Sequence, residues 1–253
     1  MLDYFILCIA AFVAGLIDAV VGGGGLVLVP TLFSVFPNTA PATLLGTNKV
    51  ASIMGTTASA VNYARTVRIR WSTAAPAAIA ALLLSFLGAF TVTHIPTGLI
   101  RQSLPFVLVA VGAYTFMKKD FGQHHVPLLS GSKEKWMAVL VGAWAGFYDG
   151  VFGPGTGSFL VFAFVRLFGF DFLRASAVSK VVNIATNLAA LTWLGYTGHV
   201  IWQLGILMAA FNIAGSLFGT KLAIRHGSGF VRRLFLVVIS ALVLKTGYDA
   251  FFR

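Results

Sequence analysis

A glycine-rich stretch inside otherwise apolar sequence constrains this chain most, and it occurs twice. The first copy is AGLIDAVVGGGGLVLVPTLF, from Ala14 to Phe33, and the second is AGFYDGVFGPGTGSFLVFAF, from Ala145 to Phe164. Each copy carries one acid, and Asp149 lies 131 residues after Asp18. The same spacing relates further special residues: Lys49 and Lys180, Trp71 and Trp202, Gly88 and Gly219, Gly98 and Gly229, and Arg101 and Arg232. We therefore predict a tandem duplication, with repeats at residues 1–119 and 134–253 and a linker at 120–133.

Composition places these repeats in a membrane. Of the 253 residues, 58% are hydrophobic and only 10% are charged, which is far from the usage of soluble domains. A transmembrane helix needs about 20 mainly apolar residues, and several such runs lie between charged or turn-rich breaks. The sequence therefore predicts an all-α polytopic membrane protein that contacts the lipid bilayer. Its start, Met-Leu-Asp, lacks the basic region of a cleavable signal peptide.

The excess of basic residues indicates topology rather than nucleic-acid binding. The net charge is +11, but Lys and Arg are concentrated in short stretches between apolar segments, as in cytoplasmic loops. The single cysteine, Cys8, excludes a disulfide framework and a cysteine metal site. The adjacent His124 and His125 lack further ligands for a metal ion. We expect no nucleic-acid partner, no metal and no cofactor.

About ten membrane segments are expected, five in each repeat. They lie at residues 4–21, 25–37, 42–63, 73–93 and 103–117, and at 136–152, 156–168, 173–195, 202–223 and 234–251. The second segment of each repeat is short, since about 13 residues at 1.5 Å each fall below a hydrocarbon core of about 30 Å. These short segments either cross the membrane or re-enter it.

Loop charge distinguishes crossing from re-entry. If the short segments cross, one face receives most basic residues: Arg65, Arg68, Arg70, Lys118, Lys119, Lys133, Lys135, Arg166, Arg174, Lys221, Arg225, Arg232 and Arg233. The other face receives Arg101 and Arg253, whereas re-entry would divide the basic residues almost evenly. Crossing fits the preference of Lys and Arg for cytoplasmic loops. An odd number of crossings per repeat then gives a five-plus-five inverted repeat with broken, glycine-rich helices. Both termini are expected outside.

The joint from Lys118 to Lys135 contains the charged groups Lys-Lys-Asp, His-His and Lys-Glu-Lys. Such a run is typical of a solvated connector, and we expect it in the cytoplasm.

Charged residues at membrane depth include Asp18, Lys49, Asp149 and Lys180. An ionised side chain at the bilayer centre costs about 2.5–3.5 kcal/mol on insertion scales, so such residues usually face a cavity or a partner. We interpret the two lysines as substrate-binding residues and the two acids as coupling or ion-pair residues.

Polar residues accompany each lysine at helical spacing. Lys49 shares one helix face with Ser52 and Thr56, and Lys180 shares one with Asn183 and Asn187. A lysine beside a strip of hydrogen-bond donors suits a small anion. Alternatively, these polar side chains form interhelical hydrogen bonds that hold the bundle together.

The glycine runs predict helix breaks. Gly22–Gly25 resembles a phosphate-binding loop but lacks its Lys-Ser/Thr ending. In a membrane, a broken helix is tolerated where its backbone lines a cavity, and the restarting helix presents a positive end. We therefore predict anion contacts at Gly24 and Gly25, and at Gly155 and Thr156. Alternatively, the glycines only permit close packing.

The doubled pattern resembles the TauE/SafE family of sulfite exporters over nearly the whole chain. The resemblance rests on GLIDAVVGGGGLVLVP with GTNK, and on GFYDGVFGPGTGSF with SKVVNIATN. It implies a multi-pass secondary transporter of the prokaryotic plasma (inner) membrane that exports sulfite, sulfoacetate or a related organosulfonate. The matching motifs extend the binding role to Asn48 and to Ser179 with Asn183. Asn48 and Ser179 occupy corresponding positions but differ in residue type. The resemblance therefore does not imply equivalent substrate sites in the two repeats.

Two features of the sequence also fit functions other than a transporter. A lysine-lined pore would make the protein an anion channel. Asp18 and Asp149 could form the dyad of an intramembrane aspartyl protease, but Ile17 and Tyr148 precede them where such proteases carry glycine. We therefore expect no enzyme activity, and no oligomeric state follows from the sequence.

The positions of the charges predict how the repeats interact. Asp18 lies about three residues from the glycine break and Lys180 about seven residues from the start of its segment, so both occupy similar depths. By inverted symmetry, Lys49 and Asp149 share the opposite level. We predict that each acid pairs with the lysine of the other repeat. Protonation of an acid would then release its lysine for an anion, which makes protons the expected coupling ion.

Overall fold

The computed structural model describes residues 2–96, 98–100, 103, 106 and 128–252, and the regular secondary structure in this part of the chain is helical. The helices are α1 (Leu2–Val21), α2 (Gly25–Val35), α3 (Pro41–Thr66), α4 (Trp71–His94), α6 (Gly131–Val151), α7 (Thr156–Phe168), α8 (Phe172–Tyr196) and α9 (Trp202–Phe252). Gly227, with a φ of 71°, breaks α9 into two parts. These bounds confirm the expected helices to within a few residues at most ends. The expected segment 103–117 lies almost wholly outside the described residues.

Four stretches of the described chain are long and apolar enough to cross a membrane: Leu2–Val21, Trp71–His94, Phe172–Tyr196 and Trp202–Gly227. Helices α2 and α7 are shorter, with 11 and 13 residues, so the ten crossings stay a prediction. Large apolar side chains such as Phe5 on α1 and Leu83 on α4 are exposed. An extended apolar surface of this kind is what contact with lipid requires.

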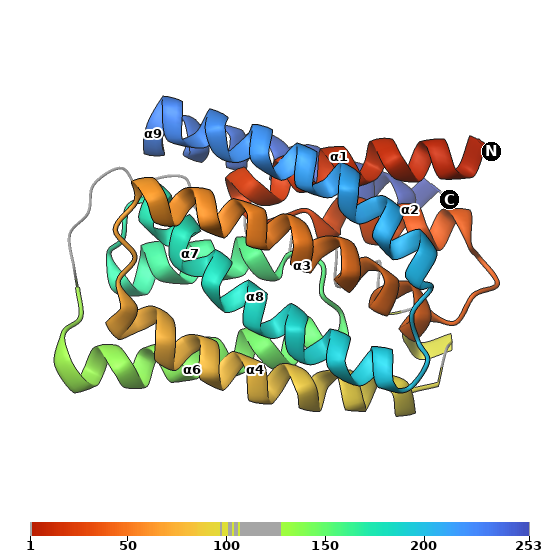
Figure 1. Cartoon of the computed structure of the whole chain (residues 1–253), viewed down its shortest axis with the longest axis horizontal. Helices are drawn as coiled ribbons and strands as arrows, with labels where there is room; N and C mark the ends of the chain where they lie inside the picture. The colour runs from red at the N-terminus through yellow and green to blue at the C-terminus, as the bar shows by residue number, and fades with distance from the viewer. Residues whose placement is uncertain (1, 97, 101–102, 104–105, 107–127, 253) are drawn as a thin grey trace.

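The helices pack by the same plan in both halves of the chain. Helices α1 and α9 lie along one side, α4 and α6 along the opposite side, and α3, α7 and α8 lie between them (Figure 1). Helix α4 packs against α6 and α8, while α9 packs against α1 and α3. Since α6, α8 and α9 follow α1, α3 and α4 at the repeat spacing, each interface has a counterpart in the other half.

Individual contacts recur at the same spacing. A Cβ added to Gly88 of α4 would lie 2.4 Å from the backbone oxygen of Phe147, and one added to Gly219 of α9 would lie 2.5 Å from that of Leu16. Gly219 and Phe147 are the counterparts of Gly88 and Leu16, respectively. The two long interfaces therefore match residue by residue at these contacts.

Glycine spacing explains why α4 and α6 approach so closely. On α6, Gly142 and Gly146 lie one turn apart, and a Cβ at these positions would come within 2.1 and 2.3 Å of the backbone oxygens of Ala77 and Ala81. Small residues at intervals of four allow helix backbones to pack directly in membranes. Any larger side chain on this face of α6 would force the helices apart.

The interior between α3 and α8 is polar. Buried polar residues on α3 include Thr47, Asn48 and Lys49, and those on α8 include Lys180 and Asn183. The two helices contact each other. Their polar faces therefore meet inside the protein, away from lipid, and the apolar residues on their other faces form the surrounding core.

The prediction of a solvated connector is wrong for Glu134, whereas Lys133 and Lys135 on either side of it are exposed. Residues 131–135 form the start of α6, and the Glu134 side chain is only 3% exposed. Its carboxylate accepts hydrogen bonds from Arg70 at 2.6 Å, from Ser72 at 2.9 Å and from Thr73. These partners lie at the start of α4, so the interface between α4 and α6 buries an acid that a charged sequence run suggested would be solvated.

Candidate functional site

Two helix breaks meet at the centre of the protein. After α1, Gly22 adopts a φ of 78°, and after α6, Gly153 adopts a φ of 87°, conformations that favour glycine. Gly22 touches Gly157, where an added Cβ would lie 2.3 Å from the Gly22 oxygen. The Ser158 hydroxyl donates to the backbone oxygen of Val21 at 3.0 Å. The breaks of the two repeats are therefore in direct backbone contact.

Lys180 of α8 and Asp18 of α1 form one buried ion pair at this centre. The Nζ and Oδ2 atoms are 2.7 Å apart, and the side chains are 1% and 14% exposed. Lys180 also donates to the backbone oxygen of Asp18. Thr56 of α3 donates to the same carboxylate at 3.2 Å. Asp18 therefore joins the end of α1 to both α3 and α8.

Lys49 of α3 and Asp149 of α6 form the second pair. Their Nζ and Oδ2 atoms are in contact, and both side chains are 3% exposed. The Lys49 ammonium also lies beside the second break, since a Cβ at Gly153 would be 3.3 Å from its Nζ atom. Both predicted pairings between the repeats are confirmed. Each lysine is neutralised by an acid from the other half of the chain.

A small cavity of about 20 Å³ lies between these groups. It is lined by Asp18, Gly22, Gly25, Asn48, Lys49, Ser52, Thr56, Asp149, Gly153, Gly155, Gly157, Asn183 and Asn187. A space of this size holds about one water molecule. Any larger anion therefore requires that the cavity widen, which separation of a lysine from its carboxylate would allow.

The cavity brings together most of the residues predicted for the site. Those outside its lining are Gly24, Thr156, Ser179 and Lys180. Gly24 packs on α1, where a Cβ would lie 2.6 Å from the Ala14 oxygen. Thr156 donates to the Gly153 oxygen at 2.9 Å and so closes the break before α7. Lys180 reaches the site through Asp18.

Two of the predicted residues carry buried polar atoms without a hydrogen-bond partner among the described residues. These are the Asn48 Oδ1 and the Ser179 Oγ, each next in sequence to a site lysine. A buried polar group left unpaired costs about 1–3 kcal/mol. Asn48 also lines the cavity, so its unsatisfied oxygen is consistent with a polar ligand there, whereas Ser179 lies outside the lining.

The sequence did not predict some of the residues that build the site. Tyr148 donates to the Pro154 oxygen at 2.6 Å and so holds the second break in shape. Its counterpart in the first repeat is Ile17, so the duplication carried no signal for this bond. Gly157 is part of the repeated glycine-rich stretch. Its contact with Gly22 joins residues far apart in the chain, so the spacing of residues did not predict it.

Comparison with known proteins identifies clear relatives. The TauE family, described as Sulfite exporter TauE/SafE, matches residues 7–246. Probable membrane transporter protein ORF9 of a Sinorhizobium species is 34% identical over 241 residues, which cover 94% of this chain and 90% of that protein. A probable membrane transporter protein of Haemophilus influenzae is 33% identical, with 96% and 94% coverage. Probable membrane transporter protein YfcA of Escherichia coli K12 is 30% identical, with 97% and 90% coverage. No solved structure matches.

Proposed function

Because the chain belongs to the TauE/SafE sulfite exporter family, whose members are membrane transporters and not enzymes, we propose that it exports a small sulfur-containing anion by secondary transport. Sulfite, sulfoacetate and related organosulfonates are the proposed substrates. The observation that carries the proposal is the burial of Lys49 and Lys180 where two helix breaks meet, each lysine held by a carboxylate from the other half of the chain.

The ion pairs support a mechanism of competition between anions. Asp18 and Asp149 occupy the lysine ammonium groups as an anionic substrate would. An entering oxyanion replaces a carboxylate and gains donors from Ser52 and Asn183 at the cavity wall. Gly25 and Gly155 place the starts of α2 and α7 at the same wall, where helix dipoles favour negative charge.

The same pairs provide a route for proton coupling. A protonated aspartate attracts lysine less than an ionised one, so proton binding to Asp18 or Asp149 frees a lysine for the substrate. Proton and anion then bind together. Release of the proton restores the ion pair and expels the anion, which couples the two movements.

The architecture that fits this mechanism is an inverted repeat of residues 1–119 and 134–253, joined by the linker at 120–133, in a prokaryotic plasma membrane. Matching helix interfaces in both halves support it. Basic loops also cluster, since Arg68 shares a pocket with Arg174, and Arg65 shares another with Arg225. We propose that this basic end faces the cytoplasm, with the termini outside.

The proposal is tested by uptake into proteoliposomes of sulfite, sulfoacetate, thiosulfate, sulfate and small carboxylates. The wild-type protein should carry at least one sulfur oxyanion with saturating flux and counterflow. Lys180→Ala should abolish this transport, because it removes one of the two site cations and leaves the Asp18 carboxylate unpaired to repel the anion. Lys221→Ala is the control, since it removes a lysine from the basic end and not from the site. Transport confined to cations or sugars would refute the proposal. Single-channel current steps would make the protein an anion channel.

A further inference from the structure

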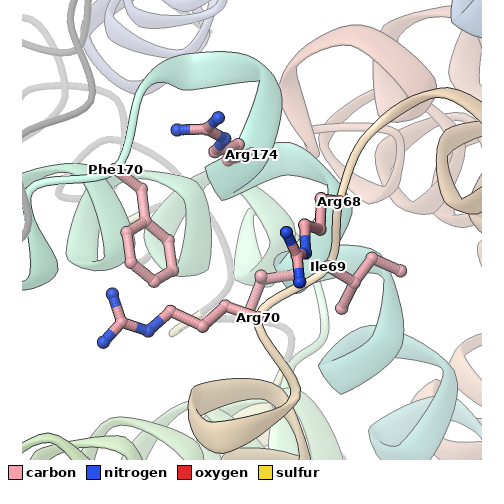
Figure 2. Close-up of a pocket in the computed structure, with 6 residues that line it drawn as sticks. Arg68, Ile69, Arg70, Phe170 and Arg174 are labelled. Carbon is pink, nitrogen blue, oxygen red and sulfur yellow. The ribbon is translucent and has the colours of Figure 1, made fainter.

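A second and larger pocket lies at the basic end of the protein. Its volume is about 240 Å³, and it is lined by Arg68, Ile69, Arg70, Phe170, Arg174 and Val178. The first three residues belong to the connection between α3 and α4, and the last two belong to α8. In the view of Figure 2, the guanidinium group of Arg174 lies above Phe170 and that of Arg70 below it, while Arg68 lies next to Ile69.

The charges around this pocket leave an excess of positive charge. Arg70 pairs with Glu134 at 2.6 Å and Arg174 lies 3.6 Å from Asp171, so both guanidinium groups are held in place. Arg68 is exposed and makes no ion pair within the part of the chain that the structure describes. Three arginines therefore face two carboxylates, and one guanidinium group is available to a ligand.

The pocket lies on the helix that carries a central lysine. Arg174 and Val178 both line it, and Lys180 follows on α8. The six residues from Arg174 to Lys180 span roughly 9 Å along a helix. An anion held among the arginines is therefore about two helical turns from the buried ion pair of Lys180 and Asp18.

At the opposite end of the protein, the described residues at the corresponding positions carry no arginine. At the repeat spacing of 131 residues, the counterparts of Arg68, Arg70 and Arg174 are His199, Ile201 and Thr43. Ile201 donates its backbone N–H to Thr47, the counterpart of Val178, so these segments meet as the arginine-bearing ones do. The two ends share a packing arrangement but differ in charge. Among the described residues at these matched positions, guanidinium groups that could bind an oxyanion occur at one end and not at the other.

We propose that Arg68, Arg70 and Arg174 form an entry site that binds the oxyanion substrate at one face before it reaches Lys180. This inference rests on the proposed function and adds a preferred side of loading. Guanidinium groups bind oxyanions through paired, charge-assisted hydrogen bonds. A cluster of them also raises the local concentration of anions. If the basic end is cytoplasmic, the asymmetry favours loading from inside, as export requires.

The test compares sulfite uptake into inverted and right-side-out membrane vesicles that contain the full chain. Arg68→Ala should raise the half-saturating sulfite concentration in inverted vesicles about fivefold, the order expected for loss of one partly exposed charged hydrogen bond. Right-side-out vesicles should retain the wild-type value. Arg68→Lys should fall between the two, since it keeps the charge and loses the paired donors.

Arg225→Ala is the matched control, because it removes one arginine from the same end of the protein but from a different pocket. An equal effect of Arg225→Ala would assign the change to general surface charge and overturn the entry site. Unchanged half-saturation in Arg68→Ala, with sulfite still transported, would overturn it as well. An effect confined to right-side-out vesicles would place the pocket at the outer face of the membrane and overturn loading from inside. Absence of anion transport by the wild-type protein is a separate result, which removes the proposed function itself.

Discussion

At the residue scale, the site is defined by two lysine–aspartate ion pairs. Any one of these charges without its partner would be costly inside the membrane. The side chains of Lys49 and Lys180 are 3% and 1% exposed, and each has one carboxylate partner. Removal of one partner from a buried pair costs about 3–5 kcal/mol, because the remaining charge is left uncompensated. Thr56 and the backbone oxygen of Asp18 add hydrogen bonds that stabilise the Lys180 pair.

Asp18→Asn should therefore change how transport depends on pH. The amide cannot take up a proton and attracts Lys180 less than a carboxylate does, so the step at which protonation frees Lys180 disappears. We expect the sulfite transport rate to depend less on pH than in the wild type, whereas Asp3→Asn, at the exposed start of α1, should leave the profile unchanged. Initial rates in proteoliposomes buffered equally on both sides measure this. A wild-type profile in Asp18→Asn would show that Asp18 does not couple protons to transport.

At the element scale, the broken helices depend on contact between glycine backbones. Gly22 and Gly157 belong to different halves of the chain, and each occupies space that a Cβ of the other would need. Tyr148 and Ser158 then fix the positions of the two breaks through hydrogen bonds to backbone oxygens. Since the starts of α2 and α7 follow these breaks, the contact positions both helix ends at the cavity.

Gly157→Ala should consequently destabilise the protein. Its Cβ would lie 2.3 Å from the Gly22 oxygen, and backbone atoms on both sides must move to relieve the overlap. Such overpacking costs about 1–3 kcal/mol. Gly98→Ala is the control, because a Cβ there meets no atom within 4 Å. Thermal unfolding of the two purified variants should show a lower midpoint for Gly157→Ala alone. Equal midpoints would mean that the breaks can separate without cost.

At the scale of the whole molecule, the family assignment makes this a multi-pass membrane transporter. Basic residues gather at one end of the protein, so its two ends differ in charge. The end of α3 with Arg65, the following connection with Arg68 and the start of α8 with Arg174 lie at the same end as Lys221 and Arg225. His199 lies at the other end, where its backbone oxygen would be 2.1 Å from a Cβ at Gly46. Five crossings per repeat, which stay a prediction, would place these two groups at opposite faces of the membrane.

Sided labelling tests that topology. In a Cys8→Ser background, Ser130→Cys should react with an impermeant thiol reagent in inverted vesicles and resist it in intact cells. Asn38→Cys, in the connection between α2 and α3, should show the reverse. Ser130 and Asn38 are both exposed, so access to the reagent depends on the side of the membrane. Three expected segments lie between the two positions, so labelling of both cysteines from the same side would contradict three crossings there and refute five crossings per repeat. Labelling of Ser130→Cys in intact cells and of Asn38→Cys in inverted vesicles would reverse the predicted orientation.

The sequence by itself determined the helices, the family and the pairing of the charges. Glycine and proline mark helix ends through local backbone geometry, so the bounds of α2 and α7 followed from Gly25 and Thr156. Acids and lysines in apolar sequence are too costly to stay unpaired, and counting residues along helices placed Asp18 level with Lys180. These conclusions depend on forces that act within one helix or across the bilayer as a whole.

Only the tertiary structure decided which backbones touch and which charges share a pocket. The contact of Gly22 with Gly157, the burial of Glu134 beneath Arg70 and the grouping of Arg68 with Arg174 each join residues from different helices or connections. Spacing along the chain does not encode them, because they depend on how closely α4 approaches α6 and α3 approaches α8. That approach is determined by the shapes of many small side chains packed together. As a result, Glu134 is buried between α4 and α6, and Arg68 and Arg174 line one pocket.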